Sequence, residues 1–396
     1  MDKNTYLSSN SSGIINYICK ELENMLTAIT NARIFTGESI IETGNVLTEE
    51  EKIIAVNTEI PAGANVIDLK GGNLAPGFID IQINGGSEKY FSQTPDTETL
   101  ADIYNTCCDY ATPFILPTLI SSPTEVILEA IDAVREFRKE RPGVLGMHLE
   151  GPFLNPSKHG AHDPLIIRKP TNAELEKIVL HGEDVIKVMT IAPEIFTNDQ
   201  INMLLDSGVV LSAGHSEMTY DQAQYDFDKG IQLVTHLYNA MTQMGHRECG
   251  IVGAVFDSDN VFAPIILDGG HCNYAAARIA LKQKEDKLFL ITDSSFLGRQ
   301  KKYFDWEGLN IEMTDGFYRD KTGNLAGAAI SMPEAVKNVV DHLRASVQEA
   351  VEMATSRVAR AIKMDDKIGF IKPGFPAKFV LFDDGLSYFR LFAPNL

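Results

Sequence analysis

Four acidic or imidazole side chains stand at or near the ends of four separate apolar segments, and this arrangement constrains the chain more than any other feature. Glu150 closes one segment, His215 closes a second, His236 lies near the end of a third and Asp293 closes a fourth. If these segments are parallel strands of one (β/α)8 barrel, their C-terminal ends meet at the face where such barrels place catalytic groups. The four side chains are then expected to converge on one site.

The types of these four residues predict metal-assisted hydrolysis. Glu150, His215 and His236 form a ligand set that catalytic zinc sites use, with a fourth position left open. Taken singly, each histidine could be a hydrogen-bonded core residue, and Glu150 could belong to a structural ion pair. Three possible ligands at the same end of three strands are hard to explain as independent core residues. Asp293, whose alternative role is to cap a following helix, is placed to move protons for an attacking water.

Eight apolar, strand-like segments alternate with segments of helical spacing in the central part of the chain. The eight segments are 77–83, 112–119, 143–150, 185–192, 208–215, 231–237, 261–268 and 287–293. In the connecting segment 124–137, Ile127, Ile131 and Val134 recur on one helical face. Eight strand–helix units favour an α/β fold of the (β/α)8 TIM-like barrel type over an open doubly wound sheet.

The segments on both sides of the barrel have a β-like pattern. Short apolar runs at 26–30, 32–35, 52–56 and 65–69 are separated by turn residues, and a further run follows at 378–382. We expect residues 25–73 and 366–396 to form a small β-sandwich domain, with the barrel of residues 74–365 inserted between its halves. Helical spacing is expected at 331–344 and 347–363. Residues 1–24 are predicted to be an N-terminal extension, with a short helix over 14–25.

Composition and charge exclude several classes of protein. The formal net charge is −19 at pH 7, and no basic run offers the surface that a nucleic-acid binder needs. No apolar run reaches the roughly 18 residues of a membrane span, and the N-terminus lacks a signal-peptide core. The five cysteines are odd in number and match no metal motif. A cytoplasmic enzyme with a small-molecule substrate is expected, without a nucleic-acid or membrane partner.

Loop residues near the strand ends add candidate substrate contacts. His162, in the loop after Glu150, is a solvated loop residue or else polarises a carbonyl or holds a sugar hydroxyl. Arg247 and His271 are candidates for anion contacts, and arginine binds phosphate in a bidentate fork. The alternative for Arg247 is an ordinary surface salt bridge.

Five motifs together resemble the amidohydrolase superfamily, and within it the branch that deacetylates amino-sugar phosphates. These motifs are 75–86 (APGFIDIQINGG), 148–155 (HLEGPFLN), 212–216 (SAGHS), 235–241 (THLYNAM) and 325–328 (LAGA). They occur in the order of the family, and the resemblance extends from about residue 26 to the C-terminus. No motif is specific alone, whereas their joint occurrence is.

The resemblance implies a role for each candidate residue. It implies one divalent metal ion per chain, zinc, bound by Glu150, His215 and His236. It implies Asp293 as the general acid/base and His162 as a catalytic contact near the scissile amide. The implied substrate contacts are Gly151, His162, Asn239, Ala240, Arg247, His271 and Leu325. Arg247 is implied to reach the substrate phosphate from the neighbouring subunit of a homodimer.

The sequence of the first barrel strand favours a single metal. Many amidohydrolases have a His-x-His pair there that binds a second metal, whereas this chain has Gln82 and Asn84. Amide side chains are poor zinc ligands beside imidazole. The implied reaction is hydrolysis of N-acetyl-D-glucosamine 6-phosphate to D-glucosamine 6-phosphate and acetate. The alternatives are the galactosamine epimer as substrate, another amidohydrolase reaction such as cyclic amide hydrolysis, and a catalytically inactive amidohydrolase-like scaffold.

Overall fold

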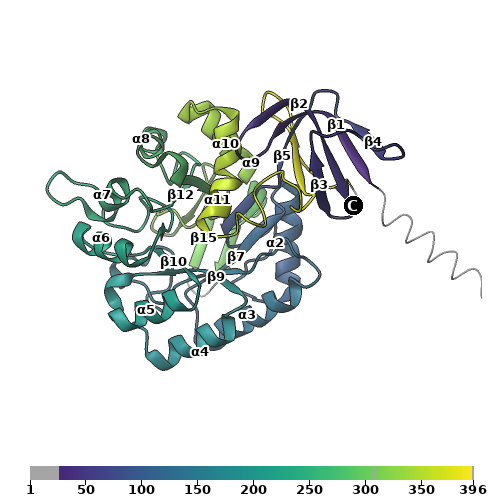
Figure 1. Ribbon diagram of the computed structural model, residues 1–396. Coiled ribbons are helices and arrows are strands. Elements are labelled where there is room, and N and C mark those ends of the chain that lie inside the picture. The colour runs from purple at the N-terminus through teal and green to yellow at the C-terminus, as the bar shows by residue number, and fades with distance from the viewer. Residues whose placement is uncertain (1–25, 307–308, 395–396) are drawn as a thin grey trace, which may run out of the picture.

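A parallel six-stranded sheet forms the centre of the protein (Figure 1). The computed structural model describes residues 26–306 and 309–394, so the expected N-terminal extension and its helix lie outside the described residues. The strand order is β11-β10-β9-β8-β7-β6. The strands are β6 (Ile79–Ile83), β7 (Phe114–Ile120), β8 (Met147–Glu150), β9 (Ile186–Ile191), β10 (Val210–Ala213) and β11 (Leu233–Val234).

A parallel pair of strands, β12 (Ala263–Ile266) and β13 (Leu288–Ile291), adjoins the sheet at both of its edges. One bridge joins Leu233 to Phe262 beside β11 and β12, and another joins Ile83 to Ser294 beside β6 and β13. Each of the eight strands overlaps one of the eight segments that the sequence predicts. Because parallel strands share a direction, their C-terminal ends lie on one side of this arrangement.

Helices connect the strands and cover the outer side of the sheet (Figure 1). Between the strands lie α2 (Thr97–Asp109), α3 (Thr124–Phe137), α4 (Asn172–Gly182), α5 (Asn198–Asp206), α6 (Tyr220–Lys229), α7 (Gly250–Asp257) and α8 (Tyr274–Lys284). Helix α3 has the predicted bounds, and its predicted apolar face is fully buried. Thr197 and Gln200 form a capping box at the start of α5, and Thr219 and Gln222 do the same for α6. No helix in the described ranges is long and apolar enough to cross a membrane.

The two long helical segments expected near the C-terminus are divided into shorter helices. They form α9 (Met332–Asn338), a π-helix (Val339–Leu343), α10 (Val347–Met353) and α11 (Ser356–Ala361). Ser331 and Glu334 form the capping box of α9. The π-helix ends at Arg344, whose left-handed φ of 63° cannot continue a right-handed helix. This turn divides the first helical segment from the second.

Segments from both ends of the chain form one seven-stranded sheet beside the central one. Its order is β18-β17-β5-β1-β2-β3, with β4 paired to β1. The strands are β1 (Thr27–Phe35), β2 (Ile40–Glu49), β3 (Lys52–Val56), β4 (Asn65–Asp68), β5 (Asn73–Pro76), β17 (Phe379–Phe382) and β18 (Phe389–Phe392). Strand β17 pairs with β5, which confirms that the C-terminal strand rejoins the N-terminal sheet. Figure 1 shows these purple and yellow strands side by side.

Strands β1 and β2 differ from the pattern expected for the N-terminal segment. The sequence predicts two strands separated at Asn31, whereas β1 is continuous. Asn31 has a φ of 50°, and the register with β2 shifts beside it, so the strand accommodates this residue as an irregularity. Strand β2 was not predicted, because Thr43, Gly44 and Asn45 within it resemble a turn.

A three-stranded antiparallel sheet that the sequence analysis did not predict follows β13. It consists of β14 (Tyr303–Trp306), β15 (Leu309–Thr314) and β16 (Phe317–Asp320). Asp315 and Gly316 make the turn between β15 and β16, with φ of 51° and 85°. An Asp-Gly pair between apolar runs is a strong hairpin signal and could have located this sheet. Its apolar side chains form a separate buried cluster with residues near the strand ends, including Tyr90, Ile120 and Phe296.

Candidate active site

Three strand ends bring the predicted metal ligands together. Nε2 of His215 and Nε2 of His236 each lie 3.2 Å from Oε1 of Glu150. The two nitrogens lie 3.1 Å from each other. A tetrahedral metal with bonds of about 2.0–2.1 Å holds its ligand atoms roughly 3.3 Å apart. The three buried side chains therefore have both the donor types and the spacing that a divalent metal ion requires.

The backbone bends sharply where these side chains emerge. The φ angle is 48° at His215, 31° at His236 and 48° at Asp293, all in the left-handed region. Non-glycine residues adopt such angles at a cost of about 1–3 kcal/mol, and such strain is concentrated at functional sites. The bends follow directly after the strands, and all three side chains together with Glu150 line one cavity of about 180 Å³. We call it the inner cavity.

Neighbouring groups set the protonation of the ligands. Nδ1 of His215 donates to the carbonyl oxygen of Lys158 at 2.7 Å, which leaves the lone pair of Nε2 for the ligand triangle. Burial alone would raise the pKa of Glu150, but the neighbouring imidazoles of His215 and His236 hold that pKa well below its usual range. The set thus offers carboxylate oxygen and imidazole nitrogen, which are donor types that bind metals.

A series of hydrogen bonds connects one buried imidazole and three buried hydroxyl groups on the strand segments that carry the ligands and on β9 between them. Nδ1 of His148 donates to the carbonyl oxygen of Ile81 (3.1 Å), so its Nε2 accepts from Thr190 (2.7 Å). Thr190 then accepts from Thr235 (2.7 Å), which accepts from Ser212 (2.6 Å). Burial lowers the pKa of His148 to about 4, which keeps this ring neutral. The series links four neighbouring strand segments, and the sequence analysis did not assign it a role.

Asp293 lies beside the triangle and is held through one oxygen. Nδ2 of Asn84 donates to Oδ1 of Asp293 at 2.9 Å, and Nε2 of Gln82 donates to the same oxygen at 3.2 Å. Nε2 of Gln82 also donates to Oε1 of Glu150 at 3.1 Å. Burial and repulsion from Glu150 raise the pKa of Asp293 to about 6. A carboxylate with that pKa is ionised at neutral pH and is well suited to accept a proton.

Asp80 is a second buried carboxyl group, and the sequence analysis did not select it. It accepts hydrogen bonds from the backbone N–H groups of Gln82 (3.2 Å) and Thr292 (3.3 Å). It thereby ties β6 to the residue that precedes Asp293. Burial raises the pKa of Asp80 to about 7.

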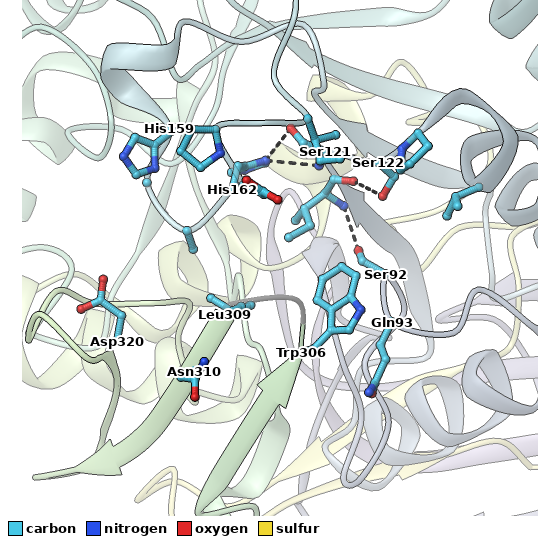
Figure 2. A pocket seen from close by; sticks show the side chains of 18 of the residues that line it. Ser92, Gln93, Ser121, Ser122, His159, His162, Trp306, Leu309, Asn310 and Asp320 are labelled. Atoms are coloured by element: carbon cyan, nitrogen blue, oxygen red, sulfur yellow. Dashed lines mark hydrogen bonds between the residues drawn. The ribbon is translucent and has the colours of Figure 1, made fainter.

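His162 reaches the inner cavity from the loop after β8. Its Nδ1 accepts from the backbone N–H of Ser121 at 3.2 Å and lies 2.8 Å from the Ser121 hydroxyl (Figure 2). Burial lowers the pKa of His162 to about 3, so the ring is neutral. Because Nδ1 accepts a hydrogen bond, the ring proton is on Nε2, which lies 4.0 Å from Oε2 of Glu150. The structure thus directs an N–H donor towards the ligand site.

The inner cavity collects most of the substrate contacts that the sequence predicts. Its lining includes the predicted residues His162, Asn239, Ala240, His271 and Leu325. Oδ2 of Asp268 accepts from Nδ1 of His271 at 2.7 Å and orients that ring. The lining also includes residues that the sequence analysis did not select, among them Tyr90, Ile120, Ile266, Ser295 and Leu309. Leu309 begins β15, and the Asp-Gly pair that follows this strand is a hairpin signal. The other residues belong to ordinary apolar or turn segments and carry no sequence signal.

Gly151 and Arg247 do not line the inner cavity within the described part of the chain. Gly151 has a φ of 83°, and a Cβ atom there would lie 2.4 Å from Oγ of Ser121. This crowding explains why a glycine follows Glu150. Arg247 is exposed on the segment that precedes α7. Their roles towards the substrate stay predictions.

Comparisons with known proteins agree with this geometry. Residues 73–395 match the Amidohydrolase family. The N-acetylglucosamine-6-phosphate deacetylase of Haemophilus influenzae is 38% identical over 365 residues, which cover 90% of this chain and 95% of the relative. An N-acetylgalactosamine-6-phosphate deacetylase of a Shewanella strain is 37% identical over 323 residues, which cover 80% of each chain.

Solved structures show the same fold over most of the chain. The N-acetylglucosamine-6-phosphate deacetylase of Pasteurella multocida superposes with a TM-score of 0.87 at 34% identity, over 91% of this chain and 96% of that one. A mutant of the Mycobacterium smegmatis enzyme in complex with N-acetyl-D-glucosamine-6-phosphate gives 0.84 at 27% identity, with the same coverage. The family match covers far more than half of the sequence. The chain therefore belongs to the amidohydrolase family.

Proposed function

We propose that this protein is a metal-dependent deacetylase that hydrolyses N-acetyl-D-glucosamine 6-phosphate to D-glucosamine 6-phosphate and acetate. The observation that carries the proposal is the buried triangle of Glu150, His215 and His236 beside the carboxylate of Asp293. The relative from Haemophilus influenzae, at 38% identity, supports the same substrate. Retention of the complete ligand set and base argues against an inactive scaffold.

The finer architecture belongs to the same proposal. We infer a closed (β/α)8 barrel over residues 74–365. One bridge joins the β12 side of the strand pair to the β11 edge of the sheet, another joins its β13 side to the β6 edge, and both support this closure. We infer a small β-sandwich domain from residues 25–73 and 366–396, and the pairing of β17 with β5 supports the association of these two segments. The protein is inferred to be a cytoplasmic homodimer.

One divalent ion, most simply zinc, would be held by Glu150, His215 and His236. When bound there it supplies Lewis-acid activation of both the attacking water and the amide carbonyl. The side-chain nitrogens of Gln82 and Asn84 donate hydrogen bonds to Asp293, which favours a single metal.

The protein's own groups carry the proton transfers. Oδ2 of Asp293, the oxygen that Gln82 and Asn84 do not hold, accepts the proton of the attacking water and later delivers it to the leaving amine. Nε2–H of His162 donates to the amide oxygen as negative charge develops there. Water oxygen bonds to the acyl carbon and the C–N bond breaks. One water proton reaches the nitrogen through Asp293 and the second leaves the carboxyl group, so the products are acetate and the protonated amine.

Contacts remote from the amide would position the sugar phosphate. Asn239, Ala240 and His271 line the inner cavity on the β11–β12 side and are proposed to hold the phosphate end. Gly151 and Leu325 are proposed to contact the substrate through the backbone. Arg247, exposed in its own chain, is proposed to reach the phosphate of the neighbouring subunit. Such contacts supply binding energy away from the chemistry.

The galactosamine epimer is the second candidate substrate. The Shewanella relative, named for N-acetylgalactosamine 6-phosphate, is 37% identical, nearly as similar as the first relative. The two substrates differ at a single hydroxyl. Comparing kcat/KM for both sugar phosphates decides between them.

Release of acetate from N-acetylglucosamine 6-phosphate tests the proposal. Turnover is expected that a chelator abolishes and added zinc restores. If the metal-loaded protein releases acetate from neither of the two epimers, the deacetylase function is refuted. Turnover that persists in the chelator-treated, metal-free protein would refute the metal dependence.

A further inference from the structure

A second cavity of about 490 Å³ adjoins the inner cavity, and the reaction proposed above leaves it unused. We call it the outer cavity. The two share the lining residues Ile120, Gly160, Ala161, His162 and Leu309. Its volume lies in the range of about 300–1,000 Å³ that is typical of ligand sites. Figure 2 shows His162 and Ser121 on one wall and Trp306, Leu309 and Asn310 on the facing wall.

The position of the outer cavity relates it to one end of the substrate. None of the residues proposed for the phosphate end, Asn239, Ala240 and His271, lines it. It opens instead beside His162, which is the donor proposed for the amide oxygen. An amide is planar and trans, so the sugar carbon and the acyl chain leave the C–N bond in opposite directions. With the sugar phosphate towards β11 and β12, the acyl chain points to the His162 side.

The lining indicates which acyl groups would fit. Apolar side chains border the entrance and the wall, among them Ile120, Val126, Ile166, Trp306 and Leu309. The charged lining residues are three carboxylates, Glu129, Asp163 and Asp320, and one lysine, Lys321. An anionic acyl chain would meet net repulsion there, whereas an uncharged chain gains from leaving water.

We propose that the outer cavity accepts neutral N-acyl chains longer than acetyl, so that the enzyme also hydrolyses N-butanoyl and N-hexanoyl glucosamine 6-phosphate. The inference rests on the proposed deacetylase function. The step is the same hydrolysis: the amide C–N bond breaks, water oxygen joins the acyl carbon, and the products are a fatty carboxylate and the amine. Only the end of the acyl chain differs, and it lies beyond Ile120 and Leu309.

The experiment compares kcat/KM for the N-acetyl, N-butanoyl and N-hexanoyl substrates. The wild-type values for the longer chains are expected to lie within about tenfold of the acetyl value. Val126→Leu, Val126→Phe and Val126→Trp fill the outer cavity stepwise from α3. They should lower the ratio of hexanoyl to acetyl kcat/KM progressively, by tenfold or more for tryptophan. Glu125→Trp, on the exposed side of α3 and outside the lining, is the matched control and should leave this ratio unchanged.

A binding measurement is independent of turnover. On the Asp293→Asn variant, titration calorimetry should give an N-hexanoyl affinity equal to or tighter than the N-acetyl affinity. Hydrolysis of the acetyl substrate with neither binding nor cleavage of the longer chains overturns the inference and leaves the deacetylase proposal intact. Failure of all three substrates refutes the deacetylase proposal itself. If Val126→Trp instead impairs a 3-O-alkyl derivative of the acetyl substrate and spares the hexanoyl one, the cavity serves the sugar ring and the inference is wrong.

Discussion

Asn84, which follows β6, donates a hydrogen bond from Nδ2 to Oδ1 of Asp293, which follows β13, across 2.9 Å. This contact fixes which carboxylate oxygen is left for the substrate. It also stabilises the ionised form of a group whose pKa burial raises to about 6. The task of the amide side chains of Gln82 and Asn84, in a site with one metal, is therefore to orient Asp293.

Asn84→Leu tests that task, since leucine has a similar size and donates no hydrogen bond. A hydrogen bond to a charged group contributes about 1.5–3 kcal/mol, so kcat should fall roughly 10- to 100-fold while metal content is unchanged. Loss of the donor raises the pKa of Asp293 further, so the acidic limb of the kcat/KM profile should move to higher pH. A pH profile that does not move would show that Asn84 does not act on Asp293.

Asp293→Asn preserves the shape of the proposed general base and removes its proton-accepting capacity. General acid–base groups contribute typically 10²–10⁴-fold, and kcat should fall by at least that much. Elemental analysis should still find metal, because Asp293 is not part of the ligand triangle. Retention of more than a tenth of the wild-type kcat would exclude Asp293 as the base.

Metal content tests the single-site prediction. About one divalent ion per chain is expected, because Glu150, His215 and His236 form one triangle and Gln82 and Asn84 are occupied as donors. His215→Ala should lose most of the ion and the activity together. Two tightly held ions per wild-type chain would contradict the prediction.

Arg247→Ala tests the proposed contact between subunits. It should impair hydrolysis of the phosphorylated substrate far more than that of unphosphorylated N-acetylglucosamine. Mixing and reassociating Arg247→Ala with Asp293→Asn should restore activity, because one site of the mixed dimer combines an intact base with an intact arginine. If reassociated dimers stay inactive, Arg247 acts within its own chain or is a surface charge.

Asp80→Asn tests a buried carboxyl group that affects stability. Its pKa is raised from 3.8 to about 7 in the folded protein, so its protonated form favours folding. That contribution is complete below pH 3.8 and is lost as the pH rises through about 7, which corresponds to up to roughly 4 kcal/mol. The Tm of Asp80→Asn minus that of the wild type should therefore increase between pH 5 and pH 8. Asp286→Asn, at an exposed position, is the control, and a difference independent of pH would refute the assignment.

Much of the fold follows from local patterns. The eight segments of the central strands and the bounds of α3 were predicted because continuous apolar runs and helical spacing are both patterns visible within a few residues. The three-stranded sheet β14–β16 was missed although Asp315 and Gly316 signal its turn. The break between the two C-terminal helical segments was predicted at Arg344, whereas the division of the second segment into α10 and α11 was not.

The sequence by itself determined the chemistry that is available: Glu150, His215, His236 and Asp293 at strand ends, and amides in place of a second metal's imidazoles. Only the tertiary structure decided that the three ligand atoms lie 3.1–3.2 Å apart and that Asn84 donates a hydrogen bond to Asp293. It also decided which nitrogen of His162 carries the proton and that the outer cavity lies beside this ring. These features depend on atoms that lie 21 to 211 positions apart in the chain. Strand register and packing bring such atoms together, and neither is encoded within any one segment.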